Sequence, residues 1–346
     1  MSNQSLPKVE LKGLLSDEDF AIFQHVNAYA GVAFSVLGIG SNFLNIKTFV
    51  TMGVDDAVTV SFLGLSISDF FISIIMFCIG ISMSFHAIEL SLGIRYTYDP
   101  LMFVMFFTNA GIALYMVTIL TTLYLAVARC MCVAKPLHFK HVFTKSRSIA
   151  ILIVFFVFCV GIYSPVFNSL GISVTFNPVL NRTRYTIWYN QGQEEVKDII
   201  YFITHDVIPF GTQIIVIVCI VVMTWNLIQS SRFRQQTTKS QADGKEAGDA
   251  NSSSSSVKLS GKELQAVQQV VLISVIFAVF NMPMILVGVF GMTEPEFDAI
   301  WGKHRYARMY YAGHFMRRVC EQINSAVNIF IYYRYNTKFR KFCKLC

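Results

Sequence analysis

The sequence has few charged residues and no cysteines placed for an extracellular disulfide. Charged residues make up 14% of the 346 positions and hydrophobic residues 54%, a balance that excludes a soluble domain of this size. No cysteine lies between Cys78 and Cys130 or between Cys159 and Cys219. An extracellular disulfide is therefore not available, and we expect the extracellular loops to be less tied down than a disulfide would leave them.

The sequence also lacks the signatures of catalysis and metal binding. It contains no nucleophile elbow, no glycine-rich phosphate loop and no Cys/His cluster at metal-ligand spacing. We therefore expect neither an enzyme nor a metal site. The net charge of +7 comes from basic residues beside hydrophobic runs, which favours membrane orientation over nucleic-acid binding.

Seven apolar runs are long enough to cross about 30 Å of hydrocarbon. They cover residues 29–50, 58–85, 101–133, 149–171, 199–228, 264–290 and 310–333. These runs predict an all-α membrane protein with a seven-helix transmembrane bundle over residues 29–333. The polar segment 229–262 within it reads as a mobile cytoplasmic loop or a solvated linker.

The two ends of the chain carry different signals. Residues 1–28 lack the continuous apolar core of a cleavable signal peptide and are predicted to be an extracellular tail. In residues 334–346, Phe339 and Phe342 alternate with basic residues, a pattern typical of a short amphipathic helix on the inner leaflet. Cys343 and Cys346 there are candidates for palmitoylation, or are unmodified thiols.

The basic residues predict the orientation in the membrane. With the N-terminus outside, 17 of the 28 Lys and Arg residues fall on the cytoplasmic side. This favours a multi-pass plasma-membrane protein with an extracellular N-terminus. Asn3 and Asn181 begin Asn-x-Ser/Thr triplets that then fall outside, so they are candidate glycosylation sites.

The last apolar run has one polar face. Its polar residues recur at steps of three or four and therefore share a helix face: Arg318, Glu321, Ser325, Asn328 and Tyr332. At membrane depth such a face turns toward a bundle interior or a wet cavity and tends to mark function. Asp69, Asn42, Thr118 and Asn324 come from this and other spans, and together with Ser325 and Asn328 they could converge at mid-membrane.

These landmarks resemble those of the rhodopsin-like (class A) G-protein-coupled receptors over about residues 25–346. The matching segments are Gly40-Ser41-Asn42, Leu65 to Asp69, Ala128-Arg129-Cys130, Pro136-Leu137, Pro209, Phe277 with Phe280 to Pro283, and Asn324 to Tyr332. The sequence departs from the usual family pattern at Ala128, Cys130, Asn281 and Ile329, and in the missing tryptophan of its fourth span. The stretch 128–137 is similar to molluscan chemosensory receptors.

The resemblance implies two internal sites. The first is a sodium-binding pocket at Asp69, Thr118, Asn324 and Ser325, with Asn42 in the same polar core. The alternative is a neutral Asp69 that is hydrogen-bonded to its Asn neighbours, because burial disfavours the charged carboxylate. The second is a switch for G-protein coupling, formed by Arg129, Glu263, Phe277, Pro283, Asn328 and Tyr332.

Arg129 and Glu263 are placed by the resemblance as a latch at the cytoplasmic ends of the third and sixth spans. Ala128 removes the acid that usually precedes the arginine, so Glu263 is the main partner left. A latch with one anchor should open more easily, which predicts raised basal activity. The alternative is that Arg129 only reaches toward water or lipid phosphate.

The outer halves of the spans supply the candidate ligand-binding residues Tyr115, His205, Asp206, Asn281, His314, Arg317, Arg318 and Glu321. Both arginines stand at helix contact spacing from Glu321, so they form either an internal salt bridge or a site for an acidic ligand or a peptide C-terminus. Where the family's amine receptors carry an acid in the third span, this chain has Gly111 and its apolar neighbours, which argues against an amine ligand.

The expected function is that of a receptor. It would bind an extracellular peptide or small chemosensory molecule and activate a heterotrimeric G protein by opening the cytoplasmic helix ends, with a sodium ion as the one possible bound cofactor. A retinal photoreceptor is excluded because residues 310–333 contain no lysine. A non-signalling decoy receptor is the main alternative, because Ala128, Cys130 and Ile329 alter switch positions, and a transporter is the other.

Overall fold

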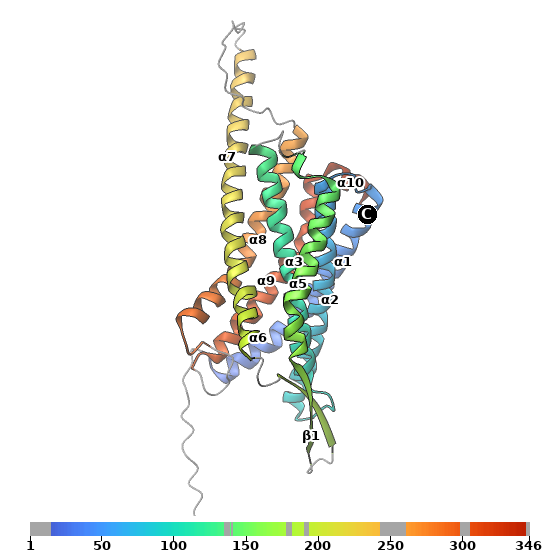
Figure 1. Cartoon of the computed structure of the whole chain (residues 1–346), viewed down its shortest axis with the longest axis vertical. Coiled ribbons are helices and arrows are strands. Elements are labelled where there is room, and N and C mark those ends of the chain that lie inside the picture. Colours follow the sequence, from blue (N-terminus) through green and yellow to red (C-terminus); the bar gives the residue numbers. More distant parts are fainter. Residues whose placement is uncertain are drawn as a thin grey trace, which may run out of the picture.

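The computed structural model describes residues 15–134, 139, 141–177, 182–189, 194–242, 261–297 and 305–343. Long helices lie side by side and form one elongated bundle (Figure 1). They are α1 (Asp17–Met52), α2 (Ala57–Leu92), α3 (Pro100–Ala134), α5 (Lys145–Asn168), α7 (Ile208–Ala242), α8 (Gly261–Thr293) and α9 (Ala307–Tyr335). The seven-helix bundle predicted from the sequence is confirmed.

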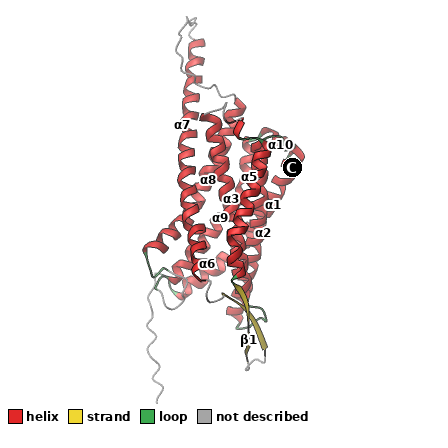
Figure 2. Ribbon diagram, in the orientation of Figure 1, coloured by secondary structure: helices red, strands yellow, loops and turns green. Residues whose placement is uncertain are grey.

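Shorter elements complete the bundle at both ends. The short helix α6 (Glu194–Tyr201) continues through one π-helical turn, η1 (Phe202–Val207), into α7. A two-stranded hairpin, β1 (Leu170–Asn177) and β2 (Arg182–Tyr189), projects from one end (Figure 2). The helix α10 (Thr337–Phe342) lies at the other end. We call these two ends the hairpin end and the α10 end.

Helix α3 lies at the centre of the bundle. It packs against α2, α5, α7 and α8, whereas α1 packs mainly against α2 and α9. In the most apolar 18-residue stretch of α3, 72% of the residues are buried, compared with 17% for α1 and for α5. The apolar side chains of α1 and α5 therefore face outward, as they do in helices that contact lipid.

Six of the described helical segments are long and apolar enough to span a membrane. Helix α9 is not among them, although its 29 residues would extend about 43 Å. Its polar residues lower its hydropathy, but it buries them by packing between α1 and α8. The predicted inward-facing polar face of the last span is therefore present.

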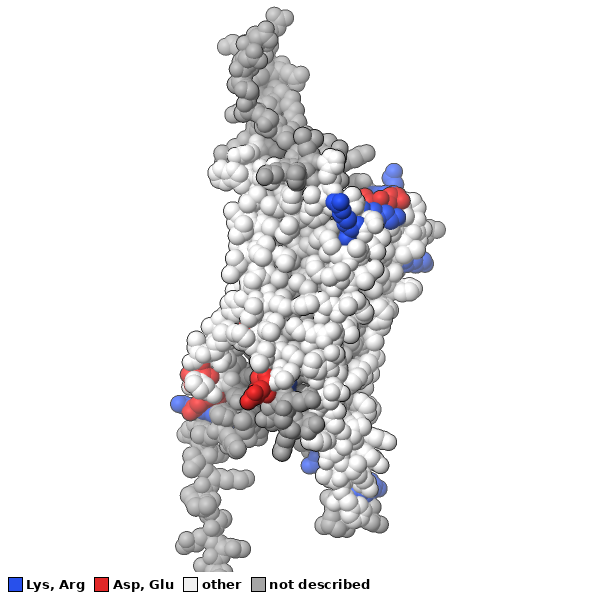
Figure 3. All heavy atoms as spheres, in the orientation of Figure 1, with Lys and Arg blue, Asp and Glu red and all other residues white. Residues whose placement is uncertain are grey.

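The outer surface of the bundle has an uncharged belt. In the view of Figure 3, acidic and basic side chains gather near the two ends, and the described surface between them is almost free of charge. Large apolar side chains such as Phe43, Val154 and Val218 are exposed on the helices within the bundle. This distribution is typical of a protein whose middle lies in hydrocarbon.

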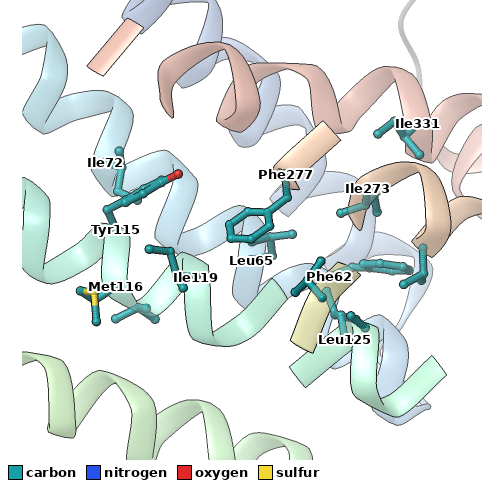
Figure 4. Packing of buried hydrophobic residues seen from close by; sticks show 14 of the residues in the cluster. Phe62, Leu65, Ile72, Tyr115, Met116, Ile119, Leu125, Ile273, Phe277 and Ile331 are labelled. Atoms are coloured by element: carbon teal, nitrogen blue, oxygen red, sulfur yellow. The ribbon is translucent and has the colours of Figure 1, made fainter. Parts of the chain in front are cut away.

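The core at the middle of the bundle is packed by large apolar side chains. Phe277 of α8 lies beside Leu65 of α2, and Ile119 of α3 lies near both (Figure 4). All three side chains are fully buried or nearly so. Because α2, α3 and α8 meet here, a movement of α8 must repack this cluster.

An ionic cluster ties the hairpin to the helices. Arg184 of β2 donates from Nη1 to Oε1 of Glu89 at 2.7 Å and from Nη2 to Oε2 at 3.2 Å. Its Nη2 also lies 3.1 Å from Oδ1 of Asp99, just before α3. Hydrogen bonding to Glu89 raises the pKa of the Arg184 guanidinium, so this pair stays charged at neutral pH. We call Glu89, Asp99 and Arg184 the Arg184 clamp.

Backbone hydrogen bonds support the Arg184 clamp. Tyr185 donates its N–H to the carbonyl of Thr97 at 2.8 Å, and Asp99 donates to the carbonyl of Tyr185 at 3.0 Å. The rings of Tyr98 and Tyr185 stack with centroids 5.1 Å apart. Charges and backbone hydrogen bonds therefore hold this hairpin against the helices without a disulfide.

The segment boundaries differ from those expected at three places. Helix α1 begins at Asp17, capped by the Ser16 side chain, so part of the predicted tail 1–28 is helical. Helix α7 extends to Ala242, so the predicted loop 229–262 begins as helix, and residues 243–260 lie outside the described structure. The amphipathic helix predicted over 334–346 is shorter, because α9 continues to Tyr335 and α10 covers only Thr337–Phe342.

Candidate ligand-binding cavity and polar core

A cavity of about 1050 Å³ lies among the helices near the hairpin end. Its walls come from α1, α2, α3, α6, η1, α8 and α9, so residues far apart in the sequence share it. Most of the lining is apolar or aromatic, with a few charged and histidine side chains. This composition and size are typical of a site for a small organic ligand.

Five of the eight predicted ligand-binding residues line this cavity. They are His205, Asp206, His314, Arg317 and Arg318. Tyr115, Asn281 and Glu321 are not part of its lining. The five residues come from η1 and α9, and the prediction named no residue of α1, α2 or α6.

The three residues that miss the cavity have other surroundings. Asn281 is fully buried and donates from Nδ2 to Oε1 of Gln213 at 3.2 Å, which joins α8 to α7. Tyr115 is buried in the apolar core, and its hydroxyl has no hydrogen-bond partner among the described residues. Glu321 is buried beside Arg317, one helical turn further along α9. None of the three can be a direct ligand contact in this arrangement.

The π-helical turn η1 brings His205 and Asp206 to the cavity. Pro209 has no N–H and so cannot donate to the carbonyl of His205. The preceding residue, Ile208, donates its N–H to the carbonyl of Ile203, five residues back, which is the hydrogen bond of a π-helix. The wider turn is fixed from outside by a hydrogen bond of 3.0 Å between the hydroxyls of Tyr163 and Thr204. Such single π turns are frequent at functional sites.

The floor of the cavity carries two consecutive arginines from α9. Arg317 is buried, with its Nε 3.2 Å from Oε1 of Glu321 and its Nη1 3.4 Å from Nδ1 of His205. Arg318 lies over the ring of Phe315, with 5.6 Å between the guanidinium carbon and the ring centroid. It forms no ion pair within the part of the chain that the structure describes. Of the two expected pairs with Glu321, only the one with Arg317 is therefore present.

A polar cluster around Asp69 lies deeper in the bundle. Thr118 donates to Oδ1 of Asp69 at 3.0 Å, and Asn328 donates from Nδ2 to Oδ2 at 2.9 Å. Ser325 donates to the backbone carbonyl of Asp69 at 3.3 Å. Asn42 donates to the backbone carbonyl of Ser325 at 3.1 Å and so connects α1 to α9. The convergence of these residues from four helices, expected from the sequence, is present.

The oxygens of this cluster suit a sodium ion in part. Asp69, Thr118 and Ser325 contribute oxygen atoms, the ligand type that hard cations prefer. Asn324 is buried but makes no hydrogen bond to the cluster among the described residues. Both carboxylate oxygens of Asp69 already accept hydrogen bonds from neutral side chains, which also fits the alternative of an uncharged Asp69. A sodium ion here would be held by Asp69, Thr118 and Ser325.

Tyr332 lies between this cluster and the α10 end, whereas Asn328 belongs to the cluster and Pro283 lies next to Met284 of the cavity lining. Tyr332 is fully buried among aromatic rings, with centroids 5.1 Å from Phe49 and from Phe62 and 5.6 Å from Phe339. Pro283 lies inside α8, six residues beyond the buried Phe277. These positions permit a hinge in α8 and a packing change at Tyr332.

Arg129 is partly buried near the α10 end of α3. Its Nε has no hydrogen-bond partner among the described residues, and Asp56 and Cys132 are the ionisable groups that act on it most closely. Glu263 belongs to α8, but its side chain lies outside the described structure. The latch between Arg129 and Glu263 therefore stays a prediction.

The predicted modification sites lie mostly outside the described structure. This applies to Asn3, Asn181 and Cys346. Cys343 is described and is buried against the aromatic cluster, only 8% exposed. Palmitoylation of Cys343 stays a prediction.

Several functional-looking residues were missed from the sequence. The Arg184 clamp was not predicted, although an acid such as Glu89 near the end of an apolar run is an unusual signal. Gln322 was also missed, and it donates to Oγ of Ser35 at 2.8 Å and so joins α9 to α1. Its spacing places it on a different face from Glu321, so the pattern of α9 alone could not show it.

A comparison with known families identifies the chain. The sequence model described as "Serpentine type 7TM GPCR chemoreceptor Srt" matches residues 16–242. No curated protein sequence matches the chain. The resemblance to seven-helix chemosensory receptors is therefore confirmed, with Srt rather than a molluscan group as the matching family. With its bundle, cavity and polar core, the chain belongs to the Srt family of serpentine seven-transmembrane chemoreceptors.

Proposed function

We propose that this receptor binds an extracellular chemical ligand in the cavity at the hairpin end and activates a heterotrimeric G protein at the α10 end. The observation that carries the proposal is the course of α9. This helix supplies the floor of the cavity, then two hydrogen-bonding residues of the Asp69 cluster, then Tyr332 in the aromatic cluster. One rigid element therefore connects the ligand site to the opposite end of the bundle.

In the proposal, the receptor lies in the plasma membrane. Its hairpin end faces the outside of the cell, and its α10 end faces the cytoplasm. The bias of Lys and Arg along the sequence supports this orientation. A ligand on Arg317 or Arg318 would favour one position of α9 over another, and so shift an equilibrium that exists without it. The bonds of Ser325 and Asn328 to Asp69 would change with that shift.

The coupling step would occur where α3, α7 and α8 end. Pro283 provides a hinge in α8, and an outward swing of α8 would expose Arg129 to a G-protein helix. The Nε atom of Arg129 has no hydrogen-bond partner among the described residues, which supports its role as a G-protein contact. Ala128 in place of an acid leaves Glu263 as the proposed restraint on this movement.

The test is basal guanine-nucleotide exchange on purified G proteins of several classes, in membranes that carry the chain. We expect exchange above that of empty membranes, a rise of about threefold in Glu263→Ala, and a fall to background in Arg129→Ala, since a loss of about 0.7 kcal/mol of restraint changes an equilibrium about threefold. Lys47→Ala is the matched control, because it removes one exposed charge from α1 at the same end.

Each outcome separates the proposal from its alternatives. Exchange equal to empty membranes in all variants, with normal surface expression, would favour the non-signalling decoy receptor, to which Ala128 and Cys130 point. Substrate flux or current in proteoliposomes would favour the transporter. An unchanged rate in Arg129→Ala would remove Arg129 from the coupling site.

A further inference from the structure

The charges at the floor of the cavity do not balance. Two consecutive arginines on α9 face one acid, Glu321, and Arg317 lies against that acid with its Nε 3.2 Å from the carboxylate. The side chains of Arg317 and Glu321 are 4% and 3% exposed, so this pair is shielded from water. Arg318 is left with a positive charge in a largely apolar surrounding, where an uncompensated charge is costly.

The surroundings of Arg318 leave its guanidinium available to the cavity. The ionisable groups that act on it are Arg317, Glu321 and Tyr310, and Glu321 is already taken by Arg317. Arg318 lies on the Phe315 ring and lines the cavity. A ring face holds a guanidinium in place but does not neutralise it, so the planar group keeps donors for a planar anion.

Two histidines add polar groups beside the arginines. His205 and His314 have ring centroids 6.4 Å apart, and both line the cavity. The Nε2 atom of His205 is buried and has no hydrogen-bond partner among the described residues. A buried polar atom without a partner costs free energy, so it is a further point at which a ligand gains by binding.

Two acids line the cavity away from its floor: Asp198, which lies 3.7 Å from Nζ of Lys197, and Asp206. Asp206 of η1 lies close to Gly288, where an added Cβ atom would meet its Oδ1. No ion pair joins Asp206 to Arg317 or Arg318 among the described residues. The carboxylate of Asp206 therefore does not neutralise Arg318 across the cavity.

We infer that the cavity binds a small monoanion with an apolar body, and that Arg318 holds its carboxylate or an equivalent planar anionic group. The inference rests on the proposed function only in taking this cavity as the ligand site. The apolar body fits the rest of the lining, which includes Met83, Val104 and Met284. A volume of about 1050 Å³ accommodates a molecule of drug-like size.

The test measures binding alone, on the purified full chain in lipid nanodiscs without a G protein. The probes are ω-phenylalkanoates with two to eight carbons in the acid chain, each beside its primary amide, which has the same shape and no charge. We expect at least one carboxylate to raise the melting temperature and to bind about tenfold tighter than its amide, as one charge-assisted hydrogen-bonding contact provides.

Variants at one position test the role of Arg318. Arg318→Gln should bind the carboxylate and its amide equally, and Arg318→Lys should keep a reduced preference, because it retains the charge but not the two-pronged geometry. Arg182→Gln is the matched control, since it removes one exposed positive charge from β2 at the same end and should keep the full preference.

The inference is overturned if no carboxylate of the series binds, if amides bind as tightly as carboxylates, or if the preference persists in Arg318→Gln. The wild-type comparison decides the first two outcomes even where a variant fails to fold. Anion-selective binding without nucleotide exchange on any G protein would refute the coupling and leave this inference intact. Nucleotide exchange triggered only by neutral or cationic ligands would refute this inference and leave the proposed coupling intact.

Discussion

The two polar sites inside the bundle differ in how completely their groups are satisfied. Around Asp69, both carboxylate oxygens accept hydrogen bonds, and the donors come from α3 and α9. At the cavity floor, Arg318 has no anionic partner among the described residues, and a buried nitrogen of His205 has no partner either. Both sites cost free energy to place in an apolar bundle, but only the first recovers that cost within the chain.

The difference indicates that one site stabilises the helix arrangement and that the other is suited to binding a ligand. A satisfied network holds helices in one arrangement and gives little to a ligand, whereas an unsatisfied site gains from whatever completes it. Under the proposed function, the Asp69 cluster would be the structural and switching element, and the cavity floor would be the recognition element. The comparison makes opposite predictions for substitutions at the two sites, because one should lower stability and the other should lower binding.

The largest effect is expected for Asp69→Ala. This change leaves Thr118 and Asn328 without their acceptor inside the bundle, so we expect the free energy of unfolding to fall by about 3 kcal/mol. The measurement is the melting temperature of the purified receptor. Asp69→Asn is the control, since it keeps one carbonyl oxygen and the side-chain volume, and it should lose less. A melting temperature of Asp69→Ala equal to that of wild type would contradict the structural role of the cluster.

A smaller loss is expected for Arg184→Gln, which extends the comparison to a satisfied ionic site. Glu89 would keep its buried carboxylate without its main partner, at a cost of about 2 kcal/mol. Hydrogen exchange of the β1 and β2 amides should become faster. The double variant Glu89→Gln/Arg184→Gln should regain part of the loss because no buried charge remains, and Arg182→Gln should behave as wild type. Unchanged exchange in Arg184→Gln would mean that the backbone bonds alone hold the hairpin.

Sodium binding at the Asp69 cluster should raise the free energy of unfolding by about 1 kcal/mol or less. If Asp69, Thr118 and Ser325 hold the ion, replacing potassium chloride with sodium chloride at equal ionic strength should raise the melting temperature, by mass action on the folded state. Asp69→Asn should remove the response. Equal melting temperatures in the two salts would favour the uncharged, hydrogen-bonded Asp69. Asn324→Ala should leave the response unchanged, since Asn324 makes no described bond to the cluster.

The smallest effect on stability is expected for Arg318→Gln. Removing a charge that has no ion-pair partner among the described residues should change the free energy of unfolding by less than about 0.5 kcal/mol or increase it slightly. Arg317→Gln is the contrasting variant, because it leaves Glu321 buried and unpaired and should lower the melting temperature clearly. If Arg318→Gln lowered the melting temperature as much as Arg317→Gln, the interpretation that Arg318 has no partner at the cavity floor would be wrong.

The sequence predicted those features that follow from local spacing. Steps of three and four along α9 placed Ser325, Asn328 and Tyr332 on one inward face, and the rarity of charge inside apolar runs singled out Asp69. The ion pair between Arg317 and Glu321 is one of the two alternatives that the sequence left open, and it forms because residues four apart on a helix are neighbours. For these residues the helix geometry alone supplies the answer.

The remaining features depend on how the helices are rotated and joined. Asn281 was assigned to the ligand site, but the rotation of α8 turns it toward Gln213 of α7. The turn η1 changes the register of the chain by one residue between α6 and α7, which no apolar pattern reveals. Glu89 and Arg184 are separated by 95 positions, and only the fold brings an acid and a base at such a distance together.

The Arg184 clamp changes what this receptor needs in order to mature. None of the seven cysteines that the structure describes is bonded to another, so the hairpin is secured without an oxidising enzyme or an oxidised glutathione pool. A thiol reductant that would unlock a sulfur-bridged loop should leave this one in place, while concentrated salt should loosen it. We therefore expect the hairpin to reach its folded position in a reducing host or a cell-free extract.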